Sequence, residues 1–254
     1  MKTPDIWAAC RDKITPGPLS GRLIRVVESQ EVVATHGLVD SMEEQALLEE
    51  MLEQTKPPRR GGTQGLHWLL ATPFRYPPLP HGSRFGSRFE GSLFYGSLGL
   101  TTAFAETAYY RFLFWHGMKE PPGHQRLLTQ HTVFKASYKT SLGLKLQQPP
   151  FDEYEALLAH RNSYEASQRL GASMRETGIE AFEFVSARDR GRGINIALFS
   201  PAALVSNKPI DPQPWLCETT PAKVSFYGRA QASQRHEFAV EDFMVAGVLP
   251  EPAL

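Results

Sequence analysis

Hydrophobic positions recur along the chain with two different periods, which predicts a mixture of strands and helices. Segments rich in β-branched and aromatic residues, bounded by turn formers, predict the strands. These segments are residues 21–30, 66–78, 92–97, 130–138, two strands joined by a polar turn within 180–204, then 223–230 and 236–245. Prolines end the second segment, which is therefore expected to be a short buried strand.

Two segments, residues 38–56 and 100–117, have helical spacing of apolar residues. Asp40 or Ser41 is expected to cap the first helix, whose apolar stripe is Met42, Ala46, Leu47 and Met51. The second helix is expected to begin at Thr101 or Thr102 and to end at Gly117. Its apolar face consists of Phe104, Ala108, Phe112 and Trp115.

A third helical segment, residues 153–178, is expected in two pieces, interrupted near residues 162–163 or at Gly171. Strands and helices thus follow one another in mixed order, without an internal repeat or a clean linker. The 254 residues, 41% of them apolar, suffice for a sizeable core. We therefore expect a single α+β domain.

Charge and composition exclude several classes of protein. Lys plus Arg and Asp plus Glu number 27 each, so no net positive field indicates direct nucleic-acid binding. Cys10 and Cys217 are too few for a disulfide framework, and no apolar run matches a signal peptide or a membrane span. We expect a cytoplasmic protein. HExxH, paired CxxC, GxSxG and Walker motifs are absent, so no metal site is expected.

The stretch from Gly82 to Glu106 concentrates reactive side chains among small and turn-forming residues. Tyr95 follows Arg84 by 11 residues, and Glu106 follows Tyr95 by 11. With Arg84 in a loop, Tyr95 near a strand end and Glu106 in the first turn of a helix, the three are expected at one end of the sheet, where ligand sites form. Singly, each has an ordinary structural explanation: a solvated loop, a packed ring and a helix-stabilising charge.

In combination, these residues resemble the signature of the RES-domain proteins, a family named for Arg, Glu and Ser. The segment GSRFG…FYGSLGLTTAFAE carries the arginine, the tyrosine and the glutamate. Arg88 repeats the S-R-F step, but the spacing favours Arg84 as the family arginine. The segment FVSARDRGRGINIALF supplies the remaining elements of the pattern in the family's order, namely Ser186, Arg188 and Asn195. Arg25 stands where the family has an N-terminal arginine.

The resemblance covers about residues 20–245 and implies a RES domain over residues 20–254, after an N-terminal extension of residues 1–19. It implies a mixed β core similar to that of ADP-ribosyltransferases, flanked by helices. RES proteins are toxins of bacterial toxin–antitoxin pairs that consume NAD+ as a substrate, so no cofactor is expected. The implied partner is a cognate helix-turn-helix antitoxin of the Xre type, in a complex that can hold several copies of each chain. Any DNA contact would come through that partner.

The resemblance assigns catalytic roles to Glu106, Arg84 and Ser186, and NAD-binding roles to Arg25, Tyr95 and Asn195. An ionised Glu106 would stabilise the ribosyl cation, arginine forks would bind the diphosphate, and the Tyr95 ring would face the nicotinamide. Ser186 would hydrogen-bond the ribose or the carboxamide. All of them are expected around one dinucleotide-sized cavity.

Three functions stay open on the sequence alone. The first is NAD+ cleavage by hydrolysis or phosphorolysis, and the second is ADP-ribose transfer to a cellular protein. The third is a non-catalytic module that binds a nucleotide or only a partner protein. Arg75, which precedes a proline-rich turn, could line the same cleft or form a structural salt bridge.

Overall fold

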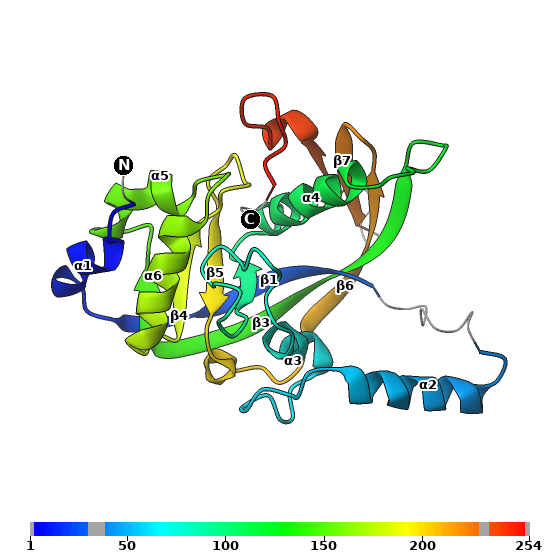
Figure 1. Ribbon diagram of the computed structural model, residues 1–254, viewed down its shortest axis with the longest axis horizontal. Coiled ribbons are helices and arrows are strands. Elements are labelled where there is room, and N and C mark those ends of the chain that lie inside the picture. Colours follow the sequence, from blue (N-terminus) through cyan, green and yellow to red (C-terminus); the bar gives the residue numbers. More distant parts are fainter. Residues whose placement is uncertain (1–2, 30–38, 229–233, 252–254) are drawn as a thin grey trace.

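A single long strand, β3, organises the β-sheet of this protein (Figure 1). The structure is a computed structural model that describes residues 3–29, 39–228 and 234–251. The described elements are α1 (Ile6–Cys10), β1 (Gly17–Glu28), α2 (Met42–Thr55), α3 (Trp68–Arg75), β2 (Phe94–Ser97), α4 (Leu100–His116), β3 (Leu127–Lys145), α5 (Glu155–Leu158), α6 (Glu165–Glu176), β4 (Ala181–Val185), β5 (Ile194–Leu198), β6 (Ile210–Thr219), β7 (Lys223–Gly228) and β8 (Arg235–Ala239). The predicted ends at Gln30, Leu38, Ala230 and Leu254 lie outside the described residues.

The eight strands form one mixed sheet in the order β1-β2-β5-β4-β3-β6-β7-β8, with an additional pairing of β1 with β3. β3 pairs antiparallel with β1 and β6 and parallel with the short β4. Strands β1, β2, β5, β4 and β3 therefore form a closed ring of pairings, because β3 also pairs with β1. Strands β6, β7 and β8 extend the sheet from the side of β3 opposite β1. A mixed sheet flanked by helices confirms the predicted α+β fold.

The helices cover the sheet in separate groups, and each group buries its own hydrophobic cluster. On α4, Phe104 stacks on Phe226 with ring centroids 4.3 Å apart and contacts Trp215 at 4.7 Å, so α4 packs on β6 and β7. α1 and α6 pack beside β4 and β5, where Cys10 of α1 is fully buried. Because β1 begins at Gly17, the chain before residue 20 contributes to both the sheet and this core.

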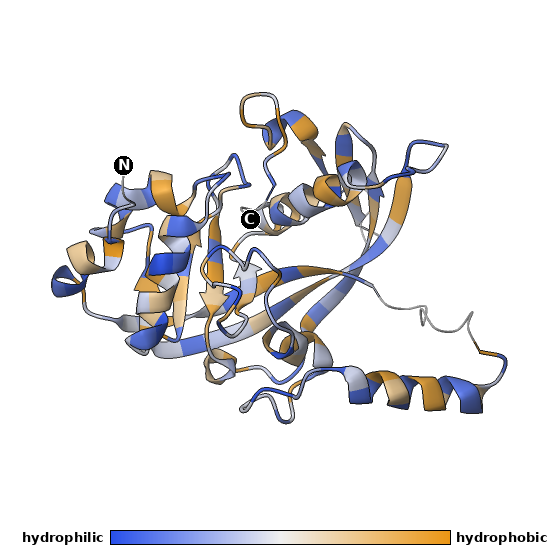
Figure 2. Ribbon diagram, in the orientation of Figure 1, coloured by the Kyte–Doolittle hydropathy of each residue, from blue (hydrophilic) through white to orange (hydrophobic). Residues whose placement is uncertain are grey.

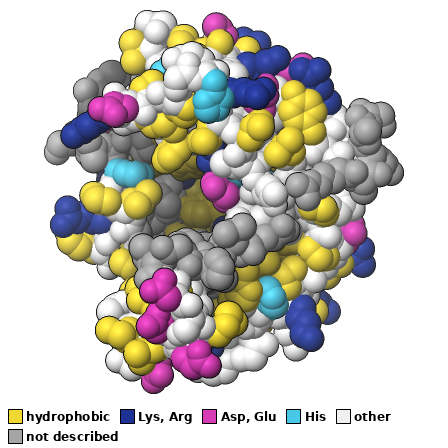
Figure 3. All heavy atoms as spheres, turned by 90° about the vertical axis from the view of Figure 1, so that its right-hand side faces the viewer, with side chains coloured by type: hydrophobic (Ala, Val, Ile, Leu, Met, Phe, Trp, Pro, Cys, Tyr) yellow, Lys and Arg dark blue, Asp and Glu magenta, His cyan; other side chains and the backbone are white. Residues whose placement is uncertain are grey.

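Helix α2 confirms the predicted helix but not a buried apolar stripe. Ser41 caps it, since its hydroxyl accepts a hydrogen bond from the Glu44 backbone N at 3.1 Å. Met42, Leu47 and Met51 are exposed. The helix carries hydrophobic and hydrophilic residues along its length (Figure 2), and acidic side chains lie next to hydrophobic ones over its end in Figure 3. No helix in the described part of the chain is long and apolar enough to cross a membrane.

The predicted strand at residues 66–78 is wrong, because this segment contains helix α3. Leu70 and Phe74, four residues apart, are both buried, and Phe74 packs on Phe94 of β2 with ring centroids 5.7 Å apart. His67 starts the helix, since its Nδ1 accepts a hydrogen bond from the Leu69 backbone N. A short apolar run does not distinguish a buried strand from one buried helical face.

Strand β6 was not predicted, because Pro212 and Pro214 argue against a strand in the interior of a sheet. The structure nevertheless places β6 between β3 and β7. Its pairing with β3 shifts register close to the prolines, between Val133 and Lys135. Beyond them the strand buries alternate residues, including Trp215, as a regular strand does.

A buried polar cluster joins β1, β3, β6 and α4. His131 of β3 is only 2% exposed, and its Nε2 contacts the Thr129 hydroxyl at 3.0 Å. Arg111 of α4 hydrogen-bonds the Thr219 hydroxyl and forms an ion pair with Glu28 at 3.1 Å. Burial, and to a lesser degree the charge of Arg111, lowers the pKa of His131 to about 4. The fold therefore holds this imidazole neutral.

We predict that His131 makes the protein less stable as the pH falls from about 6.5 towards 4. In that window the unfolded chain takes up a proton that the folded chain excludes, which costs up to about 3 kcal/mol of the free energy of unfolding. Urea unfolding at pH 7 and pH 4.5 should show a smaller loss for His131→Gln than for the native chain. The exposed His124 provides a control, since His124→Gln should lose as much as the native chain. Equal losses in all three proteins would contradict the prediction.

Candidate active site

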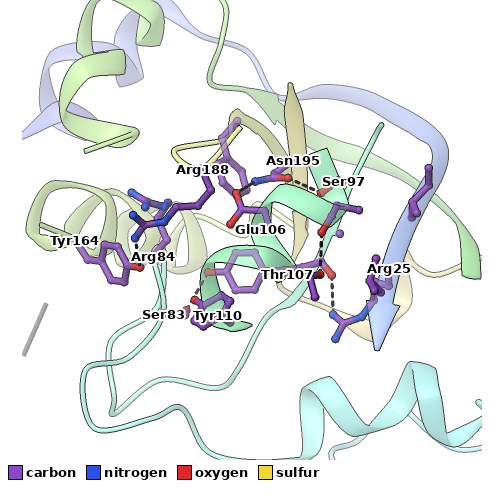
Figure 4. Close-up of a pocket in the computed structure, with 16 residues that line it drawn as sticks. Arg25, Ser83, Arg84, Ser97, Glu106, Thr107, Tyr110, Tyr164, Arg188 and Asn195 are labelled. Atoms are coloured by element: carbon purple, nitrogen blue, oxygen red, sulfur yellow. Dashed lines mark hydrogen bonds between the residues drawn. The ribbon is translucent and has the colours of Figure 1, made fainter. Parts of the chain in front are cut away.

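A cavity of about 290 Å³ brings together most of the residues predicted from the sequence. Its lining includes Arg25 of β1, Arg84 of the loop before β2, Glu106 of α4 and Asn195 of β5 (Figure 4). Tyr95 of β2 also lines it. These residues come from segments far apart in the chain. The sheet order, which places β2 between β1 and β5, brings the three strand residues together. The volume is at the low end of the range for small-molecule sites and is smaller than the dinucleotide-sized cavity expected.

The carboxylate of Glu106 is held by two hydrogen bonds to the same oxygen. The Ser186 hydroxyl donates to Glu106 Oε1 at 2.6 Å, and Asn195 Nδ2 donates to it at 2.7 Å. Among the described residues, none donates to Oε2. One oxygen thus fixes the orientation of the carboxylate, and the other remains available to a ligand in the cavity.

Both donors are themselves fixed in place. Asn195 accepts a hydrogen bond from the Ser97 hydroxyl at 2.6 Å, and these two residues are directly paired across β2 and β5. Ser186 accepts hydrogen bonds from the backbone N atoms of Arg188 and Asp189 at 3.1 and 3.0 Å. The Ser186 hydroxyl is therefore fully engaged, and this serine lies behind Glu106 and does not line the cavity.

Glu106 lies in the second turn of α4, which corrects the prediction of the first turn. The helix begins one residue before Thr101, at Leu100, and Gly99 is its N-cap residue. The helix dipole acts mainly within the first turn. The carboxylate is therefore held by the hydrogen bonds from Ser186 and Asn195, and not by the helix dipole.

The turn between β4 and β5 is tied to the start of α4, and this tie sets the distance between Ser186 and Glu106. The Thr102 hydroxyl donates to Asp189 Oδ2 at 2.8 Å. Gly193 closes the same turn, because a Cβ atom at this position would lie 1.9 Å from the Thr102 hydroxyl oxygen. Only glycine allows the turn to approach the helix so closely.

Tyr95 fixes the loop that carries Arg84. Its hydroxyl shares a hydrogen bond with the Ser83 hydroxyl at 2.9 Å and accepts one from the Phe85 backbone N at 3.1 Å. Burial raises the pKa of Tyr95 to about 12, so the phenol stays protonated. Its ring packs edge-on against Phe184. The cavity thus has Tyr95 in its wall, with the hydroxyl occupied by the loop.

The structure distinguishes the two candidate arginines. Arg84 lines the cavity, and its Nη1 donates to the backbone oxygens of Leu158 and His160 at 3.2 and 2.8 Å. Arg88 is exposed, does not line the cavity, and stacks on Phe89, which is itself 85% exposed. Of the two arginines, Arg84 is therefore the one that belongs to the cavity.

Arg25 approaches the cavity from β1. Its Nη1 donates to the Tyr95 backbone oxygen at 2.6 Å, and its guanidinium lies over the Phe94 ring at 4.6 Å. Its Nε is buried without a hydrogen-bond partner among the described residues. Burial lowers the pKa of Arg25 to about 10, a value at which the side chain still carries its charge at neutral pH.

Tyr110, Tyr164 and Arg188 also line the cavity, although the sequence assigned no role to any of them. Arg188 was noted only as part of the family pattern, and Tyr164 lies in the interruption between α5 and α6, where no local pattern marks it. Arg75, in contrast, is not part of this cavity. It forms an ion pair with Glu53 at 2.7 Å, which is the structural alternative.

The cavity has an excess of positive charge. Arg25, Arg84 and Arg188 line it, and Glu106 is its carboxylate. Within the described part of the chain, none of the three guanidiniums forms an ion pair, and their hydrogen bonds go to backbone oxygens and a tyrosine hydroxyl. Buried charges normally have a partner, so an anionic ligand is the natural complement. The described residues include no group of three or more His, Cys, Asp or Glu that could hold a metal ion.

A comparison with known protein families identifies the family of the chain. The model of one protein family, described as the RES domain, matches residues 57–218, which is more than half of the chain. The match includes Arg84, Tyr95, Glu106, Ser186 and Asn195, whereas Arg25 lies before it. No curated protein matches the chain.

We predict that Gly171→Ala disturbs the loop that carries Arg84. Gly171 lies inside α6 and does not interrupt it, and a Cβ atom there would lie 2.0 Å from the backbone oxygen of Phe85. We expect this variant to lose about 1–3 kcal/mol in the free energy of unfolding, measured by urea unfolding. Gly123→Ala is the control, because a Cβ atom at that position meets open space. A loss below 0.5 kcal/mol for Gly171→Ala (roughly the effect of an ordinary surface change) would contradict the prediction.

Proposed function

Because the chain belongs to the RES-domain family, we propose that it consumes NAD+ by breaking the bond between nicotinamide and ribose. RES domains are generally linked to toxin–antitoxin systems and to NAD-related activity. The observation that carries the proposal is the Glu106 carboxylate, which Ser186 and Asn195 hold beside a cavity rich in arginine. NAD+ combines an anionic diphosphate with a ribose that becomes cationic as the bond breaks, and the cavity offers both complementary charges.

The chemistry requires charge stabilisation more than proton transfer to the leaving group. When the bond between nicotinamide and ribose C1′ breaks, the electron pair stays on the nicotinamide nitrogen, and nicotinamide leaves as a neutral molecule. The ribose becomes an oxocarbenium ion, which an adjacent carboxylate stabilises. An acceptor oxygen then bonds to C1′ and releases its proton. Glu106 Oε2 is the atom available for the stabilising role.

Ser186 and Asn195 act on the reaction through Glu106. Both donate to Oε1, so the carboxylate is oriented before the substrate arrives and needs little reorganisation during the reaction. In this proposal Ser186 is a positioning residue rather than a contact of the ribose. Asn195 lines the cavity, so its amide can also reach the substrate.

The arginines provide the contacts for the diphosphate. A guanidinium binds phosphate oxygens through paired donors and keeps its charge at any working pH. Given the cavity volume of about 290 Å³, the nicotinamide riboside and the diphosphate occupy the cavity, and the adenosine extends beyond it. Tyr95 and Tyr110 provide aromatic surface at the same cavity for the cationic nicotinamide ring.

We predict that the purified protein releases nicotinamide from NAD+ and that Glu106→Gln slows this release by about 100- to 1,000-fold. Glutamine keeps the size and the hydrogen-bond acceptor of the side chain but removes the charge that stabilises the oxocarbenium ion. Glu120→Gln, at an exposed position outside the cavity, should retain full activity. Nicotinamide is quantified by chromatography. Intact NAD+ after incubation of the folded native chain with water, phosphate and cell extract as acceptors would contradict the proposal.

The same reaction mixture identifies the acceptor by mass spectrometry. Free ADP-ribose indicates hydrolysis, a phosphorylated ADP-ribose that forms only with phosphate indicates phosphorolysis, and a modified protein in the extract indicates ADP-ribose transfer. We propose cleavage with water or phosphate as the acceptor. Binding of NAD+ without any of these products would identify a non-catalytic nucleotide-binding module.

We also propose a cognate antitoxin of the helix-turn-helix type that covers the cavity. The family's link to toxin–antitoxin systems supports this partner, and so does the exposed aromatic side chain of Tyr110 in the cavity lining, with exposed Phe114 one turn further along α4. Expression together with the neighbouring genes should yield a complex that has no NAD+-cleaving activity and that can contain several copies of each chain. A native operon without a small helix-turn-helix gene would count against this partner.

A further inference from the structure

Arg188 is a buried cation for which the described part of the chain provides no counter-ion. The residue is 3% exposed and lines the cavity. Its Nη2 donates to the Arg161 backbone oxygen at 3.1 Å and to the Tyr164 hydroxyl at 3.4 Å. Its Nη1 is buried and has no hydrogen-bond partner among the described residues. A buried, unpaired charge is strongly unfavourable unless a ligand neutralises it.

Tyr164 connects Arg188 to Arg84. The Arg84 guanidinium lies 4.6 Å from the centroid of the Tyr164 ring, while the hydroxyl of the same tyrosine contacts Arg188. On its other side, Arg188 lies over the Tyr109 ring at 3.5 Å. The two guanidiniums therefore meet around a single aromatic side chain at one wall of the cavity (Figure 4).

The backbone around Tyr164 strengthens this arrangement. The segment between α5 and α6 offers the His160 backbone oxygen to Arg84 and the Arg161 backbone oxygen to Arg188. These oxygens are neutral acceptors, so they orient the guanidiniums without cancelling their charge. The segment therefore aims two charged forks at the cavity and leaves both without a carboxylate.

We propose that Arg188 binds the diphosphate of the dinucleotide together with Arg84, and that Tyr164 is the positioning residue for both guanidiniums. The identity of the anion rests on the proposed function. Three guanidiniums and one carboxylate at the cavity leave an excess of two positive charges, which the two negative charges of a diphosphate neutralise. Two arginine forks on one diphosphate also select against ligands that have the riboside but no phosphate.

The test compares two ligands by titration calorimetry. ADP-ribose contains the diphosphate, and nicotinamide riboside contains the scissile bond but no phosphate. Arg188→Gln should weaken ADP-ribose binding by about 10- to 100-fold, as expected for the loss of hydrogen bonds to a charged group. Its affinity for nicotinamide riboside should stay within about twofold of the native value, since that ligand makes no contact with this fork.

Matched variants separate binding from general structure. Arg190→Gln changes an arginine of the same turn whose side chain is 69% exposed and paired with Asp242, and it should leave both affinities unchanged. Arg188→Lys keeps the charge but loses the fork, so its ADP-ribose affinity should be intermediate. Tyr164→Phe keeps the ring beside Arg84 but removes the hydroxyl beside Arg188, so it should weaken ADP-ribose binding. Tyr164→Leu removes both contacts and should weaken ADP-ribose binding more than Tyr164→Phe does.

The proposal is overturned if Arg188→Gln weakens both ligands equally, if it weakens neither, or if the native protein does not bind ADP-ribose. Should Arg188→Gln fail to fold, Arg188→Lys carries the same comparison, with urea unfolding to confirm its fold. Selective loss of ADP-ribose binding in a protein that leaves NAD+ intact would sustain the role of Arg188 and reject the proposed catalysis. The two proposals can therefore fail independently.

Discussion

The two hydrogen bonds to Glu106 Oε1 are the interaction on which the site depends. They join three separate parts of the chain, since Glu106 lies on α4, Ser186 follows β4 and Asn195 lies on β5. The register of β2 against β5 supplies Ser97 to orient the asparagine, and the contact between Thr102 and Asp189 brings the serine to the helix. Several buried polar contacts thus serve to orient a single carboxylate.

Around this carboxylate the chain gathers positive charge that it does not neutralise itself. Arg25, Arg84 and Arg188 are held by backbone oxygens and aromatic rings, which fix their geometry and leave their charge available. Such an arrangement costs stability in the absence of a bound anion, most of all at Arg188, because a buried cation without a counter-ion is unfavourable. A ligand that carries both a diphosphate and a ribose accounts for this cost, because the arginines can bind the diphosphate while the carboxylate faces the ribose.

Local patterns predicted most of the fold and much of the site. The spacing from Arg84 through Tyr95 to Glu106 identified residues that the sheet does bring together, and the helix at α4 was placed within two residues of its observed start. Local patterns failed where tertiary structure decided the outcome. The prolines of β6 argued against a strand that pairing with β3 and β7 stabilises. The apolar run at α3 showed no periodicity that distinguishes a helix from a strand. Tyr164 is indistinguishable in sequence from any other tyrosine in a helix interruption, because its role comes only from the two arginines that meet there.

A crystal structure of the Glu106→Gln protein with bound NAD+ would test the central claim most directly, since the variant preserves the cavity and slows cleavage. The structure of the site predicts that the nicotinamide-bearing ribose lies against residue 106 and that the diphosphate lies between Arg84 and Arg188. Density for NAD+ elsewhere on the molecule would contradict the claim, and so would a ribose turned away from residue 106.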